Sequence, residues 1–155
     1  MNKKYNFFKR QLKKTLAVGV GIFAFTNTQA QQEVFRDLEA DKDHYTLFSL
    51  STGDTVDISD SNSTSWDLGF KGTTIILNGG VFGSGSITGQ IIENDFDDVM
   101  MAPKDGYITD ETSEYTITSG SGNGWYTYSG SPAHKIEPIA GKTILIKTVD
   151  GNYAK

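Results

Sequence analysis

The sequence predicts an all-β fold, an antiparallel sheet or sandwich-like domain. Seventeen glycines among 155 residues, together with many Ser and Thr residues, are typical of short strands joined by turns. Several short segments alternate apolar and polar side chains with the period of two that a half-buried strand shows. No stretch after residue 40 sustains the longer period that a helix requires.

The first 30 residues are typical of a secretory signal peptide. Residues 1–14 carry six Lys or Arg residues and no acid, and the apolar run Leu16–Phe25 follows them. Thr28-Gln29-Ala30 then has small residues at the first and third places of a cleavage site. The apolar run is too short to cross a bilayer as a helix, and no later segment is longer. We therefore expect an exported chain without a transmembrane span.

Removal of this leader would make the chain strongly acidic. Residues 31–155 hold 8 of the 14 basic residues and all 19 acidic ones, so their formal charge is 8 − 19 = −11. This charge repels phosphate backbones and argues against nucleic-acid binding. The absence of cysteine excludes disulfides, thiolate metal sites and a cysteine lipid anchor. The expected location is the periplasm, the outer-membrane surface or the extracellular space.

Strand candidates follow one another from residue 45 onward, after an N-terminal arm of residues 31–44. Trp66, Leu68 and Phe70 alternate onto one face and give the clearest signal. Thr73–Leu77 is continuous and β-branched, as in a strand covered on both faces. The candidates in chain order are residues 45–50, 55–58, 66–70, 73–77, 87–92, 107–109, 115–118, 125–128 and 143–149, with glycine-rich connections at 78–86 and 119–124.

The end of the sequence predicts an incomplete sheet. Asp150-Gly151 is typical of a hairpin turn, and a return strand should begin at Tyr153, yet only three residues remain. A strand usually runs for about five or six residues. An unreturned Thr143–Val149 strand would leave an apolar edge of the kind that native proteins protect. We therefore expect a fragment that lacks C-terminal strands.

Three sequence patches occur in a fixed order. They are Trp66-Asp-Leu-Gly-Phe-Lys with Asn78-Gly-Gly, then Ala102-Pro-Lys-Asp-Gly-Tyr-Ile-Thr-Asp110, then Gly124-Trp-Tyr-Thr-Tyr-Ser with Pro132 and Thr143–Lys155. Together they resemble the HmuY-like family, secreted haem carriers of Bacteroidetes, over residues 45–155. The resemblance implies an all-β fold with a haem slot, a non-enzymatic role in haem or iron acquisition, and delivery of haem to an outer-membrane receptor.

The resemblance also implies two histidine ligands to the haem iron, and neither is matched. One would lie five residues after Trp125, where this sequence has Gly130, and the stretch before Gly124 has no histidine. His134 lies four residues farther on, in the same loop. A neutral imidazole there is a candidate axial ligand. The alternative is a solvated loop histidine, which is also what we expect of His44.

Trp125, Tyr126 and Tyr128 are candidate ligand-binding residues, because aromatic rings bury a large area and stack on planar ligands. Alternation would place Trp125 on one face of its strand and the two tyrosines on the other. Ordinary packing is the alternative interpretation of these rings.

No residues at catalytic spacing appear, so we do not expect an enzyme. The acidic run at residues 93–98 lacks the Gly and the final Glu of an EF-hand loop and is expected to be solvated. The alternative to a haem carrier is a structural or adhesive envelope domain that binds a glycan or another protein.

Overall fold

The computed structural model describes residues 38–155, which form an all-β domain with antiparallel sheets, as predicted. The expected leader and residues 31–37 of the expected arm lie outside this range. The elements in chain order are β1 (Thr46–Ser49), β2 (Asp54–Val56), η1 (Ile58–Asp60), β3 (Leu68–Lys71), β4 (Thr74–Leu77), β5 (Thr88–Ile92), η2 (Phe96–Asp98), β6 (Tyr126–Tyr128), β7 (Ile136–Pro138), β8 (Thr143–Lys147) and β9 (Tyr153–Ala154). Within the described range, no helix is long and apolar enough to cross a membrane.

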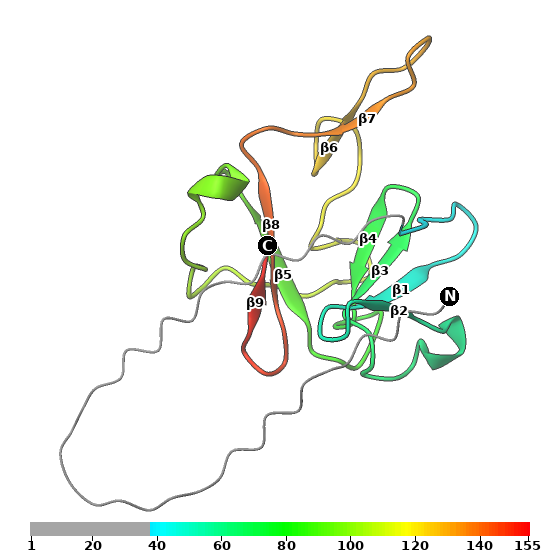
Figure 1. Cartoon of the computed structure of the whole chain (residues 1–155), viewed down its shortest axis with the longest axis vertical. Helices are drawn as coiled ribbons and strands as arrows, with labels where there is room; N and C mark the ends of the chain where they lie inside the picture. The colour runs from blue at the N-terminus through cyan, green and yellow to red at the C-terminus, as the bar shows by residue number, and fades with distance from the viewer. Residues whose placement is uncertain (1–37) are drawn as a thin grey trace, which may run out of the picture. The chain divides into compact units, whose positions relative to one another are not determined.

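The strands form three sheets, seen in Figure 1. The first has the order β2-β1-β3-β4, the second has the order β5-β8-β9, and the third is the hairpin of β6 and β7. Every pairing is antiparallel. The predicted return strand exists, because Tyr153 pairs with Lys147 and Ala154 pairs with Ile146.

The first sheet is covered on both faces. On one face, Leu47 and Ile76 pack with Trp66 into a buried cluster. Gly69 lies between Leu47 and Ile76 in the register, and a Cβ there would come within 2.8 Å of the Ile76 side chain. On the other face, Leu77 packs against buried residues of other segments, namely Ile87, Ile117 and Ile146. The prediction that the Thr73–Leu77 segment is covered on both faces is therefore confirmed.

Trp66 is a core residue, but it does not share a face with Leu68. It is 1 % exposed and belongs to the cluster with Leu47 and Ile76, whereas Leu68 packs against the opposite cluster. The predicted single face is wrong at Trp66 because β3 begins only at Leu68, and side chains alternate regularly only within a strand. The indole Nε1–H instead donates to the carbonyl of Ser61 at 3.0 Å.

The predicted strands at residues 107–109 and 115–118 do not form strand ladders. Residues 115–118 are not a strand, because the Thr116 amide donates to the Asp110 carboxylate and not to a neighbouring strand. Residues 107–109 make a single bridge, between Ile108 and Gly89. Conversely, β7 had no sequence signal: all three of its residues are exposed, and its last residue is Pro138.

Asp67, just before β3, gives the fold a predictable pH dependence. Burial raises the pKa of Asp67, and the bond from the Leu50 amide to its Oδ2 atom at 2.7 Å opposes this only in part. A carboxyl with a raised folded-state pKa stabilises the fold below its unfolded-state pKa, and this contribution is lost as pH rises through the folded-state value. We expect Asp67→Asn, which keeps an acceptor oxygen, to raise the melting temperature at about pH 7 more than at about pH 3.

Asp57 provides a control, because its pKa is shifted in the opposite direction to that of Asp67. The bond from the Ser59 amide lowers the pKa of Asp57, so its contribution is present at neutral pH and is lost as pH falls through the folded-state pKa. Asp57→Asn should therefore lower the melting temperature more at about pH 7 than at about pH 3. Melting curves in which both variants show the same pH trend would contradict the role given to Asp67.

Candidate functional site

The β6–β7 hairpin carries three of the four candidate residues, and Trp125 directly precedes it. Tyr126 is paired with Pro138, and Tyr128 is paired with Ile136. Residues directly opposite each other in a sheet share a face, so one face of the hairpin is apolar. Thr127 and Glu137 occupy the other face. Figure 1 shows the turn of this hairpin directed away from β8.

Trp125 and Tyr126 fasten the base of the hairpin to the first sheet. The Trp125 Nε1–H donates to the Thr73 carbonyl at 3.0 Å, and the Thr73 hydroxyl donates to the Tyr126 oxygen at 3.1 Å. The second bond lowers the pKa of Tyr126. The two rings lie 4.9 Å apart between centroids. Both side chains thus bond to Thr73. The expectation that Trp125 lies on the face opposite Tyr126 does not hold, because Trp125 lies before β6 begins.

Tyr128 and His134 meet at the other end of the hairpin. The Tyr128 hydroxyl is hydrogen-bonded to Nδ1 of His134, and the ring centroids are 5.9 Å apart. Both side chains are exposed. The backbone holds them in place: the His134 amide donates to the Gly130 carbonyl at 2.7 Å, and the Tyr128 amide donates to the Ser121 hydroxyl at 2.8 Å.

The turn between them has an unusual backbone. His134 has φ 49° and Gly130 has φ 70°, both in the left-handed region that non-glycine residues seldom adopt. This conformation curls the turn so that a side chain six positions after Tyr128 comes back to its hydroxyl. Only His134 is strained there, because glycine adopts a positive φ freely, and strained residues are more common at functional sites than elsewhere.

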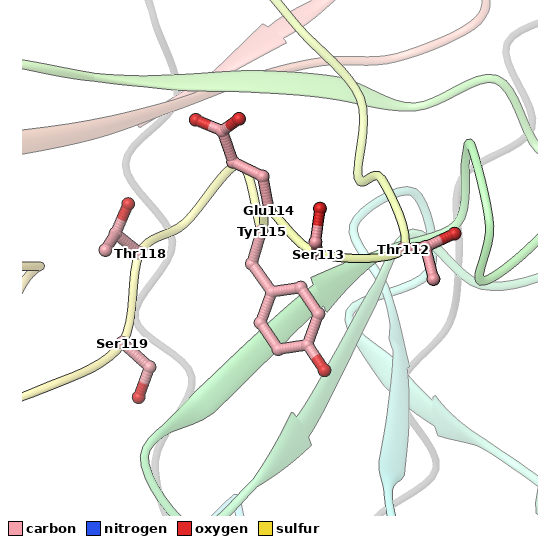
Figure 2. A pocket seen from close by; sticks show the side chains of 6 residues that line it. All are labelled: Thr112, Ser113, Glu114, Tyr115, Thr118 and Ser119. Atoms are coloured by element: carbon pink, nitrogen blue, oxygen red, sulfur yellow. The ribbon is translucent and has the colours of Figure 1, made fainter.

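The four candidate residues do not enclose a hollow; Trp125 and Tyr126 lie at the base of the hairpin, and Tyr128 and His134 lie at its tip. Two open hollows, of about 400 and 390 Å³, lie elsewhere. The first is lined by Thr112, Ser113, Glu114, Tyr115, Thr118 and Ser119. Figure 2 shows the side chains of Glu114 and Tyr115 pointing to opposite sides of the chain. The carboxylate of Glu114 and the phenol of Tyr115 therefore do not point at a common ligand.

The second hollow contains His44. Its Nδ1 atom lies 3.5 Å from Asp41 and its side chain is exposed, in agreement with the expected solvated histidine. The acidic run at residues 93–98 is exposed as well. Across residues 38–155, no three His, Asp or Glu side chains gather in a way that could hold a metal ion.

Sequence reasoning missed Asn78 and Asp110, the two polar residues of the three patches with the most completely buried side chains. Asn78 is fully buried; its Nδ2 donates to the carbonyls of Trp66 at 2.7 Å and Ser63 at 3.0 Å, and its Oδ1 accepts from the Gly85 amide at 3.0 Å. A Cβ on Gly83 would come within 1.9 Å of that oxygen. The glycine-rich loop thus closes around a buried amide, and the Asn-Gly-Gly sequence was the available signal.

Asp110, the last residue of the second patch, is the second of these two residues. It is 1 % exposed. Its Oδ2 accepts from the Leu77 amide at 2.8 Å, and its Oδ1 accepts from the Thr116 amide at 2.7 Å. The carboxylate thereby joins β4 to a segment that forms no ladder of its own.

Comparison with protein-family models gives a match to the family described as HmuY protein, over residues 41–155. The match begins within the expected N-terminal arm and includes all three patches and the whole β6–β7 hairpin. No curated protein matches the chain.

Proposed function

The chain belongs to the HmuY family, and on that premise we propose that it is an exported haem-binding protein that passes haem to an outer-membrane receptor. The family is one of haem-binding carriers and not of enzymes. For this chain, the observation that carries the proposal is the hydrogen-bonded pair of Tyr128 and His134 at the exposed tip of a hairpin. We place the haem at this tip.

The residues of the hairpin suit a haem in two respects. Phenol and imidazole are both groups that hold haem iron in proteins, and the pair offers one of each. The apolar face of the hairpin adds a flat contact area, with Tyr128 43 % exposed and Ile136 50 % exposed. Bound haem would supply the iron and the porphyrin that such a carrier delivers.

Trp125 and Tyr126 have a supporting part in this proposal. Both are bonded to Thr73, so they hold the base of the hairpin against the first sheet. Tyr126 lies on the same face as Tyr128 and Ile136, but it is buried at the base of the hairpin, with 9 % of its surface exposed, so it supports this face without offering contact area. A rigid base matters because a binding residue must be held close to its productive position by its neighbours.

Titration with haemin tests the proposal. We expect a Soret band that differs from that of free haemin and saturates at one haem per chain. Ile136→Glu places a charge on the apolar face and should weaken binding about tenfold, which corresponds to the loss of about 1.4 kcal/mol of contact. Thr127→Glu places the same charge on the opposite face of the same hairpin and should leave the affinity unchanged.

A spectrum equal to that of free haemin would rule out the haem proposal. It would favour the alternative, a structural or adhesive envelope domain that binds a glycan or another protein. Equal weakening by the two Glu variants would instead place the haem away from the apolar face of the hairpin.

A further inference from the structure

The hairpin tip offers the iron two different ligand atoms, the Tyr128 oxygen and an imidazole nitrogen of His134. The geometry points to the phenol oxygen of Tyr128 as the iron ligand, with His134 as a positioning residue that takes up the phenol proton. This inference rests on the proposed haem function and assigns the atoms of its site. It departs from the two-histidine arrangement that the family resemblance implies.

Tyr128 is the better-placed member of the pair. It belongs to β6, where it is paired with Ile136 on one side, and its amide is held by the Ser121 hydroxyl on the other. His134 lies in the turn, at a left-handed backbone position. Sites built on strands hold a ligand more accurately than sites built on loops.

Tyr128 also lies on the surface that a flat ligand would cover. It shares one face of the hairpin with the exposed residues Ile136 and Pro138, whereas Tyr126 on that face is buried. A macrocycle resting on the exposed part of that face would therefore meet the Tyr128 side chain as part of its contact area. His134 reaches the pair from the turn, through its Nδ1 atom.

The hydrogen bond supplies the proton acceptor that a phenol ligand needs. On haem binding, a bond between the Tyr128 oxygen and ferric iron would form as the O–H bond breaks, and the proton would pass to Nδ1 of His134, which lies within hydrogen-bonding distance of that oxygen. The imidazolium N–H would then donate to the phenolate oxygen in a charge-assisted hydrogen bond. The iron stays ferric, so no oxidant or reductant is required. The pair keeps its total charge, because the proton stays within it.

In the alternative arrangement, His134 donates the same hydrogen bond and Tyr128 accepts it. Nε2 of His134 would coordinate the iron, and Nδ1–H would donate to the Tyr128 oxygen, as metal-bound histidines commonly do with a neighbouring acceptor. The two arrangements differ in which side chain is indispensable. They also differ in spectrum, because a phenolate ligand has its own charge-transfer transition to ferric iron, which enhances phenolate ring modes in the resonance Raman spectrum, and an imidazole ligand does not.

Haemin titration of three variants separates these arrangements, read by absorption and by resonance Raman spectra of phenolate ring modes. Tyr128→Phe should lose the phenolate signature. His134→Asn, chosen because Asn tolerates a left-handed backbone, should keep the signature and bind about 10- to 100-fold more weakly, as expected for loss of a partner to the ligand. Tyr153→Phe changes an exposed tyrosine on β9 and should match the unaltered protein.

Two results would overturn the inference while leaving haem binding intact. One is a Tyr128→Phe spectrum identical to that of the unaltered protein. The other is an imidazole-type spectrum that disappears in His134→Asn. If the unaltered protein leaves the spectrum of free haemin unchanged, the proposed function fails and the ligand assignment fails with it.

Discussion

Asp110→Ala should destabilise the protein by about 3–5 kcal/mol, because it leaves two buried backbone donors without partners. Each of the two carboxylate oxygens accepts one amide, from Leu77 and from Thr116. An unsatisfied buried donor costs about 1–3 kcal/mol, and bonds to a charged acceptor lie at the upper end of that range. Urea unfolding, followed by tryptophan fluorescence, measures the change.

Asp110→Asn distinguishes hydrogen bonding from packing at this position. The amide is close in shape to the carboxylate, but it turns an NH₂ group toward one of the two donor amides. We therefore expect Asn to cost nearly as much as Ala. Asp105→Ala is the control: Asp105 is an exposed acid in the same patch and should change stability by less than about 0.5 kcal/mol. Equal stability of the Asp110 and Asp105 variants would contradict the role assigned to Asp110.

Asn78→Ala should also destabilise the protein by about 3–5 kcal/mol. It removes both donor bonds to the carbonyls of Trp66 and Ser63 and leaves the Gly85 amide without its acceptor. These costs add to the cavity left beside Trp66. Unfolding in urea again gives the magnitude.

Asn78→Asp keeps the side-chain volume but replaces the amide donor with a second acceptor oxygen. It places an acceptor against the carbonyls of Trp66 and Ser63, so the variant should be at least as unstable as the Ala variant. Asn62→Ala, at an exposed asparagine in the loop before β3, should have little effect. A stable Asn78→Asp protein would show that the loop does not depend on the amide donors.

The pattern of apolar and aromatic residues predicted most of the strands, and the exceptions have physical causes. Its period-two alternation located β1, β2 and β3, although Ile58 at the end of the predicted 55–58 strand lies in η1, and its continuous apolar or aromatic runs located β4, β5, β6 and β8. It missed β7, whose residues are all exposed and therefore carry no alternation. It mistook residues 115–118 for a strand, because the carboxylate of Asp110 occupies the Thr116 amide, and the spacing of apolar residues does not reveal such a partner.

The sequence identified the residues of the candidate site but not the contact between them. Tyr128 and His134 were chosen for separate reasons, one as an aromatic wall and the other as an iron ligand. Their contact depends on a turn with left-handed backbone at Gly130 and His134, and the sequence gives no sign of that conformation at a histidine. The family patches, by contrast, contain buried residues such as Asn78 and Asp110, so the resemblance reports the fold more directly than the ligands.

The position of the haem is the central claim, and nuclear magnetic resonance of the protein with gallium(III) protoporphyrin tests it most directly. This compound is diamagnetic, and its metal ion accepts oxygen ligands as ferric iron does. We predict that the largest backbone amide shift changes fall on the β6–β7 hairpin and on the segment around Ser121. Changes centred on the hollow around Tyr115, or no changes at all, would contradict the placement of haem at the Tyr128–His134 pair.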